Sequence, residues 1–159
     1  MGAASLQPGS LSASDRPRCP VLSEGMTTRV QAWLRQADSD LAVGQLTEAK
    51  GFHSQACYHY SQAAEKALKG ALISLGVLPP YSHSLDRLIN ALDQQGVNSN
   101  ALQALHVKAL SRMSSETRYP QNDEAPVDRF DAKDSAQART ISEGILIFVK
   151  SILKPEDNV

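Results

Sequence analysis

The chain has 159 residues, the size of one domain with a single hydrophobic core. Its 16 Lys and Arg against 17 Asp and Glu give a formal net charge of -1, which disfavours a protein that holds nucleic acid through a broadly basic surface. Aromatic residues make up only 5%, too few for a platform on which several bases stack. The 2 cysteines form neither a disulfide framework nor a zinc knuckle, so we expect a protein of the reducing cytoplasm.

The first 25 residues differ in composition from the remainder. They hold five Ser, three Pro and three Gly, with no apolar run long enough for a secretory signal. No window of the chain approaches the roughly 20 apolar residues of a membrane span. We therefore expect residues 1–25 to be a flexible tail, with Met26 as an alternative start of the native chain, and residues 26–155 to form the domain. We expect no membrane association.

Downstream of the tail, apolar residues recur at three- and four-residue steps, which predicts helices. The first predicted helix covers about residues 27–49. The second covers about 53–75 and includes Leu68 in its apolar stripe. Gly76 is a suitable stop for this helix, and Pro79-Pro80 cannot continue it.

Two shorter helices are predicted next. The third follows Ser82, which can cap it, and is closed by Gly96. The fourth carries an apolar stripe from Leu102 to Met113 and ends near Arg118, because Pro120 disfavours helical backbone at the residue before it.

An acidic loop over residues 120–131 precedes the last predicted helix, 132–153. The apolar side chains of this helix extend well beyond one face, which indicates burial on two sides. The helix therefore either lies at the centre of the bundle, which we favour, or forms part of a subunit interface. These apolar residues are Ile141, Ile145, Leu146, Phe148, Val149, Ile152 and Leu153. With no convincing strand and short connections, the sequence predicts an all-α, up-and-down bundle of about five helices.

The sequence lacks the common motifs of phosphate-binding loops, nucleophile elbows and zinc sites. Cys57 is better explained as a small buried apolar residue than as a nucleophile. We expect His53, His59 and His106 to lie on helix surfaces in contact with solvent. We expect no metal site and no cofactor.

Five segments form the most distinctive pattern of the chain. They are AWLRQADSDL, FHSQACYHYSQAAEKALKGALISLG, HSLDRLINAL, TRYP and FDAKDSAQARTI, which together extend from Ala32 to Ile141. In order and spacing they resemble the HEPN family (higher eukaryote and prokaryote nucleotide-binding), and the resemblance continues to Leu153. It implies a bundle of about five helices that commonly forms a homodimer. Relatives often act beside a minimal nucleotidyltransferase as a toxin–antitoxin pair.

The resemblance also raises the question of ribonuclease activity. Many HEPN proteins are metal-independent ribonucleases whose signature, contributed by both subunits of a dimer, is an Arg followed a few residues later by a His. No Arg stands at that distance before any of the 4 histidines of this chain, and Arg112 is followed by Arg118 where the His would be expected. This departure argues against ribonuclease activity.

The remaining candidate site residues lie around the third and fourth predicted helices. The candidate catalytic residues are Arg118 and Tyr119 of the TRYP segment, with His83 before the third helix. Lys108, Arg112 and Arg118 form a candidate anion-binding set on one helix. The forked donors of an arginine suit a phosphate, and a tyrosine can supply a hydroxyl or stack on a base.

Each candidate also has a structural interpretation. Arg118 can pair with carboxylates of the acidic loop, Tyr119 can simply end the helix with Pro120, and His83 can pack or cap near Ser82. The interpretation we favour is a binding module for a nucleotide, RNA or a nucleotidyltransferase partner. The alternatives are a metal-independent ribonuclease with a variant site around Arg118 and Tyr119, for which no base is evident nearby in sequence, and a purely structural interaction domain.

Overall fold

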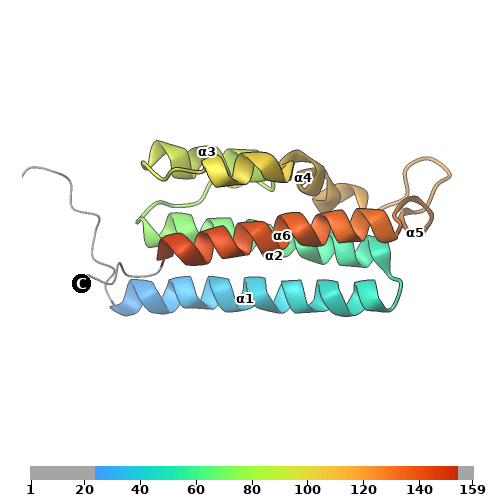
Figure 1. The fold of residues 1–159 in the computed structure, drawn as a ribbon, viewed down its shortest axis with the longest axis horizontal. Helices are drawn as coiled ribbons and strands as arrows, with labels where there is room; N and C mark the ends of the chain where they lie inside the picture. The colour runs from blue at the N-terminus through green and yellow to red at the C-terminus, as the bar shows by residue number, and fades with distance from the viewer. Residues whose placement is uncertain (1–23, 154–159) are drawn as a thin grey trace, which may run out of the picture.

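The computed structural model describes residues 24–153 (Figure 1). The elements are α1 (Glu24–Ala49), α2 (His53–Ser74), α3 (Leu85–Gln94), the 3-10 helix η2 (Asn100–Leu105), α4 (Val107–Glu116), α5 (Pro126–Arg129) and α6 (Ala132–Leu153). Within residues 24–153 no strand forms, and the predicted all-α helical bundle is confirmed. The predicted tail falls outside the described residues, except that α1 begins at Glu24, three residues before the predicted start.

The helices are arranged around α2. In Figure 1, α1 lies on one side, α2 and α6 lie in the middle, and α3 with α4 lies on the other side. Helix α2 packs against α1, α3, α4, α5 and α6, and most of its residues are buried. The last helix, which we expected at the centre, thus shares the middle layer, but α2 is the helix around which the others pack.

Small side chains explain how α2 accommodates so many neighbours. Alanine and glycine recur along its buried faces and allow neighbouring backbones to approach closely. A Cβ on Gly70, for example, would lie 3.2 Å from the Cβ of Trp33 on α1. The small residues alternate with large ones that fill the core, among them Leu68, which is fully buried as predicted. The buried alanine and glycine residues of α2 are Ala56, Ala63, Ala64, Ala67, Gly70 and Ala71.

Tyr60 of α2 is the largest fully buried side chain of the core. Its hydroxyl donates a hydrogen bond to Glu48 of α1, and Arg139 of α6 lies 3.7 Å from the same carboxylate. Burial and the bond to Glu48 raise the pKa of Tyr60. The ring packs directly on Gly44 of α1, where a Cβ would lie 2.6 Å from the nearest ring carbon. Only glycine fits at this crossing of α1 and α2.

Turn signals set the ends of α2 and α3 as the sequence indicates. Gly76 and Gly96 have φ angles of 73° and 83°, the left-handed conformation that glycine adopts without a steric penalty. The cap of α3 differs from the prediction. The Ser84 hydroxyl, not that of Ser82, accepts the bond from the Arg87 N–H at 3.4 Å, while Ser82 accepts one from Ser84 N–H at 3.0 Å.

The fourth predicted helix is broken into two pieces. His106, expected within this helix, has φ 52° and ψ 45° and separates η2 from α4. Histidine is one of the few non-glycine residue types enriched in this left-handed conformation. No Gly or Pro marks the break, so the prediction of one continuous helix was wrong here.

The acidic loop also contains structure that was not predicted. Pro126 opens the single turn of α5, because proline suits the first position of a helix. Arg129 of α5 pairs with Glu116 of α4 at 3.8 Å and with Glu124 of the loop at 3.6 Å. The loop is thus fixed to the end of α4.

Helix α6 has the predicted bounds. Asp131 accepts backbone N–H bonds from Lys133 and Asp134 at its start, and these bonds lower the pKa of Asp131. The helix packs against α2, α1, η2 and α4, which agrees with burial on more than one side. Ile147 nevertheless remains 70% exposed. None of the helices in residues 24–153 is long and apolar enough to cross a membrane.

Two helical glycines give a matched test of this packing. We expect Gly44→Ala to lower the free energy of unfolding by about 1–3 kcal/mol, because the new methyl meets the buried ring of Tyr60. This exceeds the roughly 1 kcal/mol that alanine gains over glycine in a helix. Gly144→Ala meets only the tip of the Leu105 side chain, 2.8 Å away, which can move, so we expect a change within about 1 kcal/mol. Urea unfolding followed by circular dichroism measures both. A Gly44→Ala protein as stable as wild type would contradict the close approach of α1 to Tyr60.

Candidate functional site

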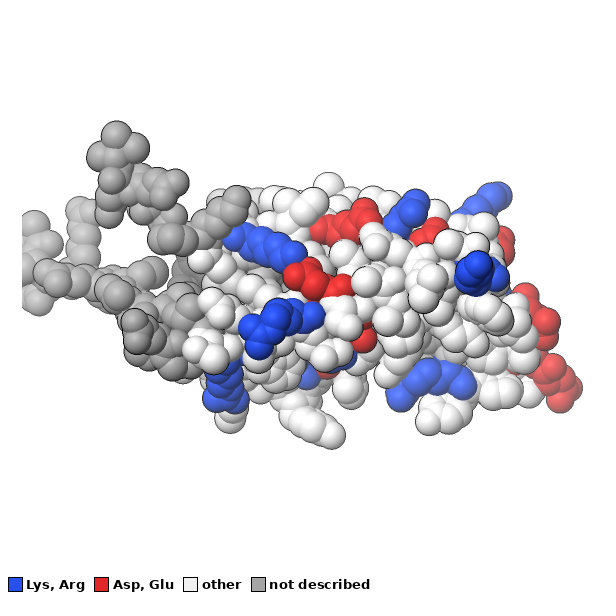
Figure 2. Space-filling view, turned by 90° about the horizontal axis from the view of Figure 1, so that it is seen from below, with Lys and Arg blue, Asp and Glu red and all other residues white. Residues whose placement is uncertain are grey.

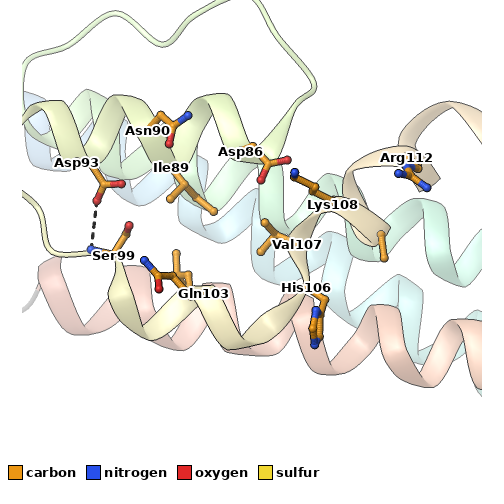
Figure 3. Close-up of a pocket in the computed structure, with 12 residues that line it drawn as sticks. Asp86, Ile89, Asn90, Asp93, Ser99, Gln103, His106, Val107, Lys108 and Arg112 are labelled. Carbon is orange, nitrogen blue, oxygen red and sulfur yellow. Dashed lines mark hydrogen bonds between the residues drawn. The ribbon is translucent and has the colours of Figure 1, made fainter.

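His83, Lys108 and Arg112, three of the predicted site residues, line one cavity. This cavity has a volume of about 350 Å³ and lies between the start of α3 and the exposed side of α4. Hydroxyl groups of Ser84 and Ser111 also line it. Figure 3 shows Lys108 extending from α4 toward Asp86 of α3, with Arg112 further along α4. We call this cavity the α3–α4 cavity.

The segment that follows α2 brings His83 to this cavity. Residues 75–84 run back along α2, so that His83 lies beside Glu65 rather than beside the end of the helix. Ser111 of α4 fixes this arrangement, because its hydroxyl accepts a bond from the Leu85 N–H at 2.9 Å and donates to the His83 carbonyl at 3.5 Å. The start of α3 is therefore tied to α4.

Glu65 holds the imidazole of His83 in place. Its carboxylate lies 3.0 and 3.2 Å from Nδ1 of His83 and also accepts a bond from Lys69 Nζ at 2.7 Å. The Glu65 side chain is only 7% exposed, whereas that of His83 is 66% exposed. With Nδ1 engaged by the carboxylate, Nε2 is the ring nitrogen left to accept or donate a proton. We call Glu65 and His83 the dyad.

Arg118 and Tyr119 lie beyond the α3–α4 cavity, past the end of α4. The guanidinium of Arg118 lies 5.4 Å from the ring centre of Tyr58 on α2 and 5.5 Å from that of Tyr119. Arg118 forms no ion pair with any residue in the range 24–153, and Arg129 pairs with the carboxylates of Glu116 and Glu124. The alternative in which Arg118 pairs with the acidic loop is thus not what the structure shows.

The residues of the α3–α4 cavity and the pair Arg118 and Tyr119 lie beside the same face of α2. Tyr58 and Glu65 are seven residues apart, two helical turns or about 10 Å along the axis. The structure thus brings His83, Lys108 and Arg112 together and places Arg118 with Tyr119 further along the same side of the bundle. Three residues of this face were not among the site residues predicted from the sequence: Glu65, Lys69 and Tyr58. Their helical spacing was a signal that they share a face, but nothing in the sequence shows that Glu65 is buried.

A second buried carboxylate lies between α2 and α1. Asp40 is 8% exposed, pairs with Lys66, and lies 3.4 Å from Nδ1 of His59. Likewise, His53 Nδ1 contacts the Ser135 hydroxyl at 2.9 Å. Neither histidine is the simple solvated residue that was expected. Both contacts join helices of the core.

Cys57 is buried, as predicted, and unsuited to nucleophilic chemistry. Burial raises the pKa of its thiol from 9.0 to about 12, and the negative charges of Asp134 and Glu48 add to this effect. Across residues 24–153, no three His, Cys, Asp or Glu side chains lie close enough together to hold a metal ion.

Comparison with known proteins places the chain in a family. The family model described as "HEPN domain" matches residues 30–152. The chain belongs to the HEPN family. A crystal structure of TT1696 from Thermus thermophilus is 31% identical, with a TM-score of 0.71, and covers 79% of this chain and 98% of its own. ST0689, described as an archaeal HEPN homologue, is 24% identical with a TM-score of 0.62 and the same coverage, and shows the fold alone. A search of curated proteins gave no match.

The segments that carried the resemblance to the HEPN family meet in space. HSLDRLINAL supplies His83, TRYP supplies Arg118 and Tyr119, and the long segment of α2 supplies Tyr58 and Glu65 between them. In this HEPN protein the candidate site is therefore the surface formed by α2, the start of α3 and the exposed side of α4.

The face of the bundle that carries α1, opposite the candidate site, differs from that site in its charge. Figure 2 shows Lys and Arg interspersed with Asp and Glu on the face that carries α1. Asp38 of α1, for example, pairs with Lys150 of α6 at 2.6 Å. A face of paired, mixed charges offers no continuous basic surface to nucleic acid.

Proposed function

We propose that this HEPN protein binds the phosphate groups of a nucleotide or RNA through α4, without cutting the ligand. The observation that carries the proposal is the set of three cations, Lys108, Arg112 and Arg118. All three are exposed, and none forms an ion pair with another described residue. Lys66, Lys69, Arg129, Arg139 and Lys150 each pair with a carboxylate. Five other cations of the described residues are unpaired but lie on other elements, whereas these three follow one another along α4 and the segment after it. The five are Arg29, Arg35, Lys50, Arg87 and Lys133.

The surroundings of these cations suit phosphate. Arginine presents paired N–H donors that match two phosphate oxygens, and lysine adds a point charge. Ser84 lines the same cavity, and its hydroxyl, which accepts the bond from the Arg87 N–H, can add a neutral donor. Tyr119 is 66% exposed beside Arg118, so a base can stack on its ring while Arg118 holds the adjoining phosphate.

The proposal includes partners. We infer that the protein acts as a homodimer and beside a nucleotidyltransferase, in the manner of a toxin–antitoxin pair, as the resemblance of the sequence implies. Exposed apolar side chains on neighbouring α1 and α6 support an interface there. Leu46 is 61% exposed, Ile147 70% and Ile152 38%. Exposed apolar side chains on adjoining helices can become buried in a subunit contact.

One observation favours a second candidate function, a metal-independent ribonuclease. Such an enzyme needs a base for the attacking hydroxyl and a cation for the charge that develops on phosphorus. The sequence showed no base near the cations, whereas the dyad supplies an imidazole whose orientation a buried carboxylate fixes, in the same cavity as Lys108 and Arg112. We rank this candidate below binding alone, because the usual Arg-to-His signature is absent.

Binding by α4 predicts a specific salt dependence. We expect Arg112→Ala and Arg118→Ala each to weaken binding of a short, 5′-phosphorylated single-stranded RNA about ten-fold or more, since hydrogen bonds to charged groups are lost. The slope of log affinity against log salt should also fall by about 0.7 for each cation removed. Fluorescence anisotropy measures both. The matched control is Arg35→Ala, which removes an exposed arginine from α1. Equal losses in Arg35→Ala would contradict a site on α4.

Cleavage is tested with the same RNA in EDTA. We expect the wild-type protein to leave the RNA intact even in molar excess, because the proposed function is binding alone. Cleavage by wild type that is abolished in His83→Ala, reduced in Glu65→Gln and Arg118→Ala, and retained in Arg35→Ala would instead establish the ribonuclease. Gel electrophoresis of end-labelled RNA distinguishes these outcomes. Cleavage equal in all variants would identify a contaminating nuclease.

The proposed dimer predicts that one charge on α6 separates the subunits. Ile147→Glu should shift the mass measured by light scattering from that of a dimer to that of a monomer, because an unpaired carboxylate would be buried in the interface. Gln137→Glu, at another exposed position of α6, adds the same charge and should leave the dimer intact. A wild-type protein that is monomeric at all concentrations would refute this part of the proposal.

A further inference from the structure

A larger cavity adjoins the α3–α4 cavity. It has a volume of about 560 Å³ and lies between α3, η2 and the start of α4 (Figure 3). Asp86, Lys108 and Arg112 line both cavities and form the boundary between them. The volume is within the range of sites for small organic ligands. We call it the α3–η2 cavity.

The lining of the α3–η2 cavity is apolar at its base and polar around it. Ile89 and Leu102 are buried, and they form its apolar part with the half-buried Val107. The polar groups include the amides of Asn90 and Gln103. A cavity with an apolar base and a few amides around it suits a flat ring that carries hydrogen-bonding groups.

The break at His106 makes this arrangement possible. Because His106 adopts a left-handed conformation, η2 and α4 do not continue as one helix. Figure 3 shows Ser99, directly before η2, and Gln103 of η2 opposite Ile89 of α3. Ser99 is fixed there by a bond from its N–H to Asp93 at 3.3 Å. The wall of the cavity that carries Gln103 is thus held against α3.

Charge is distributed unequally along the α3–η2 cavity. Lys108, Arg112 and the carboxylate of Asp86 lie where it joins the smaller cavity and leave an excess of one positive charge there, while Asp93 lies seven residues, or about 10 Å, along α3 from Asp86. The cationic end suits a phosphate. The end near Asp93 suits hydrogen-bond donors such as ribose hydroxyls or an amino group, and it repels a second phosphate.

We propose that the α3–η2 cavity binds the nucleoside part of a nucleoside monophosphate, whose phosphate lies between Lys108 and Arg112. The inference rests on the proposed function, since it uses the same cations, and it extends that function by naming the ligand and its orientation. The carboxylate of Asp93 disfavours continuation of a nucleic acid chain past this end. The ligand is therefore a mononucleotide or the terminal nucleotide of a chain that enters from Arg118.

The test is a titration calorimetry series with AMP, GMP, CMP, UMP, adenosine and inorganic phosphate. We expect at least one monophosphate to bind more tightly than either inorganic phosphate or adenosine. Asn90→Ala and Gln103→Ala should each weaken that nucleotide about five-fold, the effect of one lost hydrogen bond, and leave inorganic phosphate unchanged. The matched control is Gln94→Ala, one turn further along α3 and exposed, but not in the lining of the cavity. Circular dichroism confirms that the variants are folded.

The outcomes separate this inference from the proposed function. If the nucleotides bind no better than inorganic phosphate, or if Asn90→Ala and Gln103→Ala bind them as wild type does, the α3–η2 cavity is not the nucleoside site. The phosphate site of α4 would then still stand on the loss of phosphate binding in Arg112→Ala. If neither the nucleotides, inorganic phosphate nor the RNA binds at all, the proposed function itself is overturned.

Discussion

The close packing of other helices around α2 is the constraint on which the rest of the structure depends. Five helices of residues 24–153 contact α2, and they can do so because alanine and glycine recur among its buried residues. A helix surrounded in this way has little surface left for polar residues, so each one that remains must be satisfied within the bundle. Among these buried polar residues, Glu65 matters most for function. It lies on α2, where the segment after the helix returns, and its burial creates the need for the partners His83 and Lys69.

The two buried carboxylates of the bundle are each stabilised by one lysine and one histidine. Asp40 lies between a lysine and a histidine of α2, and Glu65 lies between Lys69 and His83. A buried charge is costly unless it is paired and hydrogen-bonded. The two clusters differ in the exposure of the histidine. His59 is half-buried against α1, whereas His83 is largely exposed and lines a cavity with two cations. Burial of Glu65 therefore fixes the direction of a group that solvent and ligands can reach.

Much of the fold could be predicted from the sequence, because its signals are local. Glycine at the ends of α2 and α3 and the apolar stripe of α6 depend on neighbouring residues alone. The break at His106 could not be predicted, since no glycine or proline marks it and the tertiary structure holds its left-handed backbone. The candidate residues His83, Lys108 and Arg112 were found from the sequence, but Glu65 was not. Its role depends on the return of residues 75–84 along α2, a contact across many residues that periodicity does not encode.

The near-neutral charge of the chain and a phosphate site are compatible because of how the charges are paired. Arg129 pairs with the carboxylates of Glu116 and Glu124, two of the acidic groups near the TRYP segment, whereas Arg118 pairs with no carboxylate of residues 24–153. A carboxylate paired with Arg118 would compete with any anionic ligand. Arg118 instead lies against Tyr58 and Tyr119, aromatic rings that position a cation without neutralising it. The protein thus keeps a local excess of positive charge on α4 while its total charge stays close to zero.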